Sequence, residues 1–249
     1  MREAWFHVSD LHAGELTLDP GQARHAVQSL RLKAGDPLTL FDGEGRVAAG
    51  TLRPPDEGNR SSGRRKPAIV RVQVNEVRQA PAPTRSVSLV VAACKGPRLD
   101  WLVEKITELG VSRLILTDFD HSVVRVGPQH LDRLNRVALE TCKQCRRAWR
   151  PRLELAPSPL DAAAARRDAA LLVAHRQDEA PPLGVWLAQH GQAATDCVAV
   201  VGPEGGLSLH ELDALRHAGG KFVRLGEHVL RVETAALAVA ATWANYADA

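Results

Sequence analysis

The chain has 249 residues, a hydrophobic content of 45% and a formal net charge of +3 at pH 7. These values are typical of a soluble protein with an ordinary buried core, arranged as one large domain or two small ones. The first ten residues lack the apolar segment of a signal peptide, and no apolar run is long enough to span a membrane, so we expect a cytoplasmic protein.

Four cysteines are present, and their placement inside apparent helices and strands indicates reduced thiols. The closely spaced pair Cys142 and Cys145 has no second pair to complete a zinc site. We therefore expect no metal, and we assign the pair a structural role.

The first part of the chain reads as short strands separated by turns. We expect strands at residues 5–8, 38–41, 47–52 and 69–77, and a short helix at residues 25–32. Asp42-Gly43 predicts a hairpin turn between the second and third of these strands. This spacing predicts a small β-barrel domain over residues 1–78. Residues 54–67 are polar and rich in structure breakers, which predicts a mobile loop, and residues 79–85 form a proline-rich linker.

Residues 86–249 alternate strand and helix, the pattern of an α/β sheet. The expected strands are residues 87–93, 112–117, 169–174, 198–201 and 222–225; the expected helices are residues 99–109, 131–149, 182–190 and those that follow the last two strands. Helix 131–149 carries an apolar stripe, which consists of Leu134, Ala138, Cys142 and Cys145. It also carries a mostly basic stripe, made of Arg133, Arg136, Glu140, Lys143, Arg147 and Arg150, which favours either a polyanionic partner or a solvated face.

Two glycine-bearing turns stand out near the carboxyl end. The first spans residues 202–206 and is followed by Ser208 and Glu211, whose spacing predicts a capping box that starts a helix. The second spans residues 226–229. Neither a dinucleotide fingerprint nor a P-loop is present. Glycines at strand ends favour a ligand held by main-chain groups, although a turn without a ligand is an equal alternative on this pattern alone.

Four signatures resemble the RsmE family of SPOUT-class methyltransferases, which methylate N3 of a uridine in small-subunit ribosomal RNA. His25, Leu30-Arg31, Lys33 and Phe41-Asp42-Gly43 are similar to the PUA-like module of that family. Lys95-Gly96 and residues 101–111 resemble its first catalytic-domain motif. Residues 202–208 match its hallmark loop, and Leu225-Gly226 with residues 230–235 match its last motif. The chain departs from the family at His121 and at Lys143, where arginine and glutamate are usual.

The resemblance implies a trefoil-knotted, mostly parallel α/β sheet that binds S-adenosylmethionine, an N-terminal PUA-like domain, and a homodimer acting on 16S ribosomal RNA. The residues that we expect to contact the methyl donor are His175, Val201, Gly202, Pro203, Glu204, Gly205, Gly206, Leu225, Gly226, Val229, Leu230, Arg231, Thr234 and Ala235.

For catalysis we expect Arg231 to stabilise the developing uridine anion and Glu204 or Glu233 to accept the proton or to orient Arg231. Glu233 can equally be a helix-starting carboxylate, and His175 a structural residue. The expected RNA contacts are Arg2, His25, Arg31, Lys33, Arg125, Arg136 and Arg147. Two alternatives remain: a catalytically silent RNA-binding protein on the same scaffold, and a methyltransferase for another RNA atom.

Overall fold

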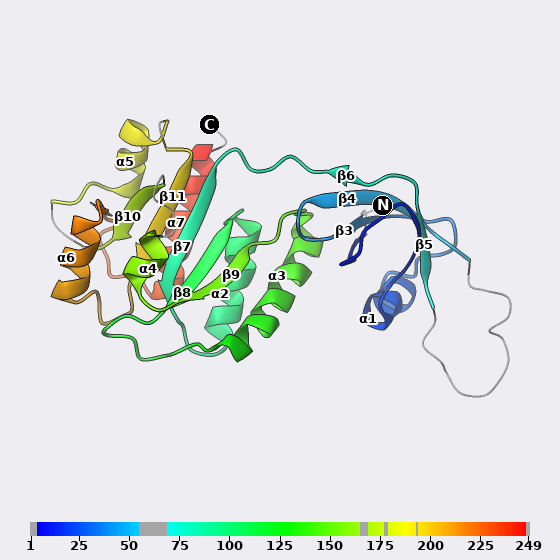
Figure 1. The fold of residues 1–249 in the computed structure, drawn as a ribbon, viewed down its shortest axis with the longest axis horizontal. Coiled ribbons are helices and arrows are strands. Elements are labelled where there is room, and N and C mark those ends of the chain that lie inside the picture. Colours follow the sequence, from blue (N-terminus) through cyan, green and yellow to red (C-terminus); the bar gives the residue numbers. More distant parts are fainter. Residues whose placement is uncertain (1–3, 55–68, 165–168, 177–178, 193, 248–249) are drawn as a thin grey trace. The chain divides into compact units, whose positions relative to one another are not determined.

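The computed structural model describes residues 4–54, 69–164, 169–176, 179–192 and 194–247 (Figure 1). The chain divides into two compact units. The first consists of Met1–Ala82 with Cys142–Arg150, and the second of Pro83–Thr141 with Pro151–Ala249. No helix among the described residues is long and apolar enough to cross a membrane.

The first unit is built on a six-stranded sheet. Its strands are β1 (Trp5–His7), β2 (Gly14–Thr17), β3 (Pro37–Phe41), β4 (Arg46–Leu52), β5 (Arg71–Val74) and β6 (Arg78–Gln79). They follow the order β1-β3-β4-β5-β2, with β6 paired to β4, and every pair except β1–β3 is antiparallel. The predicted hairpin of β3 and β4 is confirmed, and its inward side chains form one apolar cluster.

Several local predictions in this unit were wrong. The helix expected at residues 25–32 starts earlier, as α1 (Pro20–Arg24), and continues as a short π-helix (His25–Ser29). Its true start is set by Asp19, whose carboxylate accepts hydrogen bonds from the N–H groups of Gly21 and Gln22. Strand β2 was not expected, and β5 is shorter than predicted. Residues 55–68, which hold most of the predicted loop, lie outside the described residues.

The second unit is a six-stranded sheet in which all pairs are parallel. Its strands are β7 (Ser86–Ala92), β8 (Arg113–Thr117), β9 (Arg152–Ala156), β10 (Ala170–Ala174), β11 (Asp196–Val201) and β12 (Lys221–Val223). Their order is β12-β10-β11-β7-β8-β9. Helices cover both faces, so the central strands are buried on both sides and read as continuous apolar runs. Along β7, Leu89 and Val91 belong to one apolar cluster, while Val90 and Ala92 belong to the other.

The helices divide between these two clusters. Helices α2 (Pro97–Glu108), α3 (Leu131–Cys145), α5 (Leu183–His190) and α7 (Val232–Ala247) pack into the first cluster, and α4 (Pro159–Ala164) and α6 (Leu209–His217) pack into the second. Figure 1 shows α7 and α2 on one side of the sheet and α4 and α6 on the other.

Helix α3 is shorter than the predicted 131–149 segment. It ends at Cys145 because Arg146 takes a left-handed backbone conformation with φ 58°. Leu134, Ala138 and Cys142 are buried, as expected, but Cys145 is exposed and does not belong to the apolar stripe. Arg147 and Arg150 lie beyond the helix. Strand β9 and helix α4 were not predicted.

The predicted capping box at the start of α6 is confirmed. The Ser208 hydroxyl accepts a hydrogen bond from the Glu211 N–H at 3.2 Å, and the Glu211 carboxylate accepts one from the Ser208 N–H at 2.8 Å. We expect Ser208→Ala to lower the free energy of unfolding by about 1 kcal/mol, because a helix N–H loses its cap. Chemical denaturation measures this loss. Ser29→Ala, at an exposed position, is the control, and equal stability of the two variants would contradict the assignment.

Candidate functional site

Three loops meet at the carboxyl ends of neighbouring parallel strands. Residues 174–176 leave β10, residues 201–207 leave β11, and residues 224–230 follow β12. Because β10 lies between β11 and β12, these chain segments emerge side by side at one edge of the sheet. This is where an open α/β sheet places a ligand.

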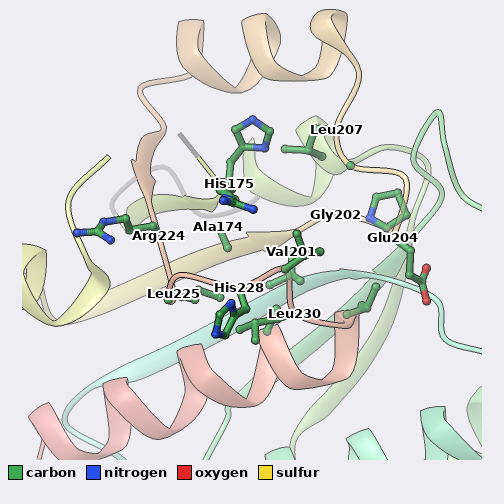
Figure 2. A pocket seen from close by; sticks show the side chains of 17 residues that line it. Ala174, His175, Val201, Gly202, Glu204, Leu207, Arg224, Leu225, His228 and Leu230 are labelled. Carbon is green, nitrogen blue, oxygen red and sulfur yellow. The ribbon is translucent and has the colours of Figure 1, made fainter. Parts of the chain in front are cut away.

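The loops border a cavity of about 220 Å³ that is open to solvent. In Figure 2, His175 and Leu207 border it on one side and Leu225, His228 and Leu230 on the other, with Val201 and Gly202 between them. The predicted donor-binding residues that line the cavity are His175, Val201, Gly202, Pro203, Glu204, Gly206, Leu225, Gly226, Val229, Leu230 and Ala235.

Other residues of the lining were not predicted. They are Ala174, Arg176, Leu207, Arg224, His228 and Val232. Each is adjacent in the chain to a predicted residue, and Ala174, Arg176 and Arg224 also lie at or next to a strand end, which was the available signal. Figure 2 shows the Arg224 side chain directed away from the other labelled side chains.

The loop after β11 has a tight internal turn. The N–H of Gly206 donates to the carbonyl of Pro203 at 2.9 Å, and Gly206 has a φ of 77°, where a residue with a side chain would be strained. A side chain at Gly202 would start 2.9 Å from the Leu207 side chain. The glycines therefore allow both the turn and its close packing. Gly205 is exposed and does not line the cavity.

The loop after β12 gives the cavity an apolar side. Leu225 and Leu230 are partly buried and pack against the larger apolar cluster, whereas Val229 is 77% exposed. A Cβ atom at Gly226 would meet no protein atom within 4 Å. The space beside Gly226 is therefore open to a ligand.

His175 occupies the end of β10, where its N–H donates to the carbonyl of Val223. Its ring lies edge-on to Phe222, with the ring centroids 6.2 Å apart, and the Arg216 guanidinium covers Phe222. Burial lowers the pKa of His175, and the positive charge of Arg216 lowers it further. The ring is therefore neutral at neutral pH and adds no positive charge to the cavity.

Arg231, Glu233 and Thr234 do not line the cavity in this structure. Arg231 is exposed and sits between two residues of the lining, Leu230 and Val232. The Glu233 carboxylate is buried, where it accepts a hydrogen bond from Arg98 at 3.4 Å and lies 3.8 Å from the Cys94 sulfur. Arg231 thus lies at the rim of the cavity, and Glu233 is buried next to Arg98 and Cys94.

The three buried thiols of the chain, Cys94, Cys142 and Cys197, all have a raised pKa. Burial raises the pKa of Cys94 to about 12, with a further contribution from the negative charges of Glu233 and Glu204. Burial also raises the pKa of Cys142 to about 12 and raises that of Cys197. These three thiols stay protonated at neutral pH, whereas the fourth, Cys145, is exposed.

We therefore expect a single fast-reacting thiol in the native protein, at Cys145. The thiolate is the reactive form, so at about pH 8 a thiol whose pKa has been raised and whose sulfur is buried reacts slowly. A disulfide-exchange reagent should modify one thiol quickly and the others only after unfolding in guanidinium. Cys145→Ser should remove the fast phase, and rapid modification of a second thiol would contradict this description.

The predicted RNA contacts fall in different environments. In the first unit His25, Arg31 and Lys33 are exposed, and Arg31 has a left-handed φ of 55°. In the second unit Arg125 and Arg136 are exposed. Arg2 lies outside the described residues.

The basic stripe of α3 is partly neutralised. Arg133 is paired with Asp100, and Arg150, beyond the helix, is paired with Glu44 at 2.9 Å. Arg147 is partly buried, and burial lowers its pKa. Arg136 and Arg147 are the two predicted RNA contacts in this stripe, and Arg136 is the more accessible of the two.

Comparison with known proteins identifies relatives over most of the chain. The RNA methyltransferase domain family matches residues 80–244, and the RNA methyltransferase PUA domain family matches residues 18–59. The ribosomal RNA small subunit methyltransferase E of Mycobacterium bovis is 31% identical over 228 residues, which cover 88% of this chain and 82% of that protein. The protein of the same name from Bacillus subtilis is 26% identical over 225 residues, covering 87% and 84%.

The fold is also found among solved structures. The ribosomal RNA small subunit methyltransferase E of Neisseria gonorrhoeae, bound to S-adenosylmethionine, superposes with a TM-score of 0.75 at 23% identity. The match covers 96% of each chain.

Proposed function

Because the chain belongs to the ribosomal RNA small subunit methyltransferase E (RsmE) family, we propose that it transfers a methyl group from S-adenosylmethionine to N3 of one uridine in 16S ribosomal RNA. The observation that carries this proposal is the cavity at the strand ends. The two glycine-bearing loops of the sequence, which are separated by α6 and β12, border the same space.

The residues around the cavity fit this methyl donor. Main-chain groups of the glycine loops can contact adenine at close range, and Leu225, Val229 and Leu230 supply apolar contact for its faces. Among the described residues of the lining, Glu204 is the acidic one, which suits a positively charged sulfur, and His175 is neutral; Arg176 and Arg224 supply positive charge to the same lining. When bound, the donor supplies the methyl group from this sulfur.

The acceptor atom needs help from the protein. Uridine N3 carries a proton and is a poor nucleophile until that proton leaves. Arg231, at the rim of the cavity, stabilises the negative charge that develops on the base, and as an arginine it stays protonated. Glu204 is exposed at the cavity and accepts the N3 proton. Glu233 anchors the start of α7 through Arg98, a role supported by its burial.

The RNA is held outside this centre. His25, Arg31 and Lys33 in the first unit, and Arg125 and Arg136 in the second, contact phosphates and so position the RNA without reading its sequence. The target uridine leaves its stack to enter the site, because N3 lies on its pairing edge. The resemblance to the RsmE family also supports a trefoil-knotted chain, a homodimer and a cytoplasmic location.

The test is to incubate the protein and labelled methyl donor with small ribosomal subunits from a strain that lacks the protein, followed by identification of the labelled nucleoside. We expect 3-methyluridine. A label on a ribose 2′-hydroxyl would favour a methyltransferase of another specificity. Calorimetry with S-adenosylmethionine tests the remaining alternative, because a catalytically silent RNA-binding protein would give no heat at high donor concentration.

A further inference from the structure

A four-residue segment that follows β8 contacts the glycine loop that follows β11. His121 Nδ1 lies 3.2 Å from the carbonyl oxygens of both Gly205 and Gly206. The Asp120 carboxylate accepts a hydrogen bond from the Ser208 hydroxyl, and the Asp120 N–H donates to the Glu211 carboxylate at 2.9 Å. We call residues 119–122 the brace, because each of these bonds joins it to residues 205–211, which comprise the end of the glycine loop and the start of α6.

The brace is itself held in shape. The Phe119 N–H donates to the Ser122 hydroxyl, and the Ser122 N–H donates to the Phe119 carbonyl, each at 2.9 Å. Phe119 is buried in the apolar cluster that includes Leu207 and Leu212, so the segment has a fixed base. His121 is exposed at its tip. The brace thus presents the imidazole to the loop from a rigid support.

The contact settles which ring nitrogen of His121 carries a proton. Both partners are carbonyl oxygens, which only accept hydrogen bonds, so Nδ1 must be the donor. This donor is present whether the ring is neutral or charged. The bond therefore needs the Nδ1 position of the side chain and not its charge.

A hydrogen bond to this loop offsets the conformational entropy that is lost when its glycines are ordered. Fixing one residue costs about 1–2 kcal/mol of conformational entropy, and glycines lose the most freedom. Gly205 has no side chain to pack, and a Cβ there would lie 2.9 Å from the Cβ of His121, so its absence allows the close approach. Because a peptide unit is planar and trans, turning the Gly206 carbonyl toward His121 turns the Leu207 N–H the opposite way. Gly206 and Leu207 both line the cavity.

We propose that His121 is a positioning residue for the methyl donor: its Nδ1–H holds the Gly205 and Gly206 carbonyls and thereby sets the donor-binding shape of the loop. The identity of the ligand rests on the proposed function, whereas the ordering of the loop by His121 does not depend on that function.

Three substitutions separate this role from others. In His121→Asn the amide nitrogen takes the place of Nδ1, in His121→Gln the amide lies near the place of Nε2, and His121→Leu has neither. We expect the Kd for S-adenosylmethionine to rise about three- to tenfold in the Gln and Leu variants, the value of one neutral hydrogen bond, and to stay within about twofold in the Asn variant. His210→Leu, at another exposed histidine, is the matched control.

Amide hydrogen exchange of residues 205–208 without any donor gives the second readout. Exchange should be faster in the Gln and Leu variants than in the wild type and the Asn variant. Equal Kd values and equal exchange in all variants would overturn the proposal. Loss of turnover in all three variants at saturating donor, with unchanged Kd, would also overturn it, because His121 would then act on the acceptor through Nε2. If the wild type bound no donor, the proposed function would fail, and the exchange rates would still decide the role of His121.

Discussion

Arg231→Ala is expected to lower the rate of methyl transfer at saturating donor and RNA by about 10²- to 10³-fold, while the Kd for S-adenosylmethionine stays within about twofold. The magnitude is that of removing one group that stabilises charge developing in a transition state. Arg231 is exposed, precedes α7 and lies next to Leu230 and Val232 of the cavity, so its loss removes a charge at the rim and not a wall of the pocket.

Single-turnover kinetics on small ribosomal subunits, with calorimetry for donor binding, measures the two quantities separately. Arg231→Lys keeps a positive charge without the planar guanidinium, and should recover part of the lost rate. An alanine variant with full turnover would show that the anion is stabilised by another group.

Gly226→Leu is expected to raise the Kd for S-adenosylmethionine at least about 100-fold, or about 3 kcal/mol, with little change in the melting temperature. Gly226 lines the cavity, and no protein atom lies within 4 Å of the position of an added Cβ. Its φ is outside the left-handed region, so a side chain there causes no backbone strain. The leucine side chain therefore enters the space that we propose for the donor, without disturbing the fold.

Gly184→Leu is the matched control. Gly184 is equally open to an added side chain, but it lies in α5 and does not line the cavity. Calorimetry gives the Kd values and scanning calorimetry the melting temperatures. Normal donor binding by Gly226→Leu would place the donor outside this cavity. A large loss of stability would contradict the expectation that the leucine side chain meets no protein atom.

Much of the second unit was predictable because parallel strands buried on both faces read as unbroken apolar runs. This holds for β7, β10 and β11. Strand β9 was not predicted because it has no unbroken apolar run. It is an edge strand, paired only to β8 among the described residues, and its sequence mixes arginine and glutamate with leucine. The capping box of Ser208 and Glu211 is a local signal, and local signals are the most transferable.

The failures have local physical causes. Helix α3 was predicted to run to residue 149, because nothing in the sequence marks Arg146 as left-handed. Helix α1 was placed too late because the apolar pattern began after its Asp19-Pro20 start, which was itself a capping signal.

The candidate site was only partly accessible from sequence. The two glycine loops could be found in the chain, but their common cavity depends on the pairing of β10 with both β11 and β12. Arg176, Arg224 and His228 join the lining through that geometry. The contact of His121 with Gly205, which lies 84 residues away in the chain, required the three-dimensional structure.

The most direct test of this account is a crystal structure of the protein with S-adenosylmethionine. We expect the donor in the cavity between the loops that follow β11 and β12, with its adenine in contact with Leu225 and the space beside Gly226. A donor bound elsewhere, or loops that do not both contact it, would contradict the account.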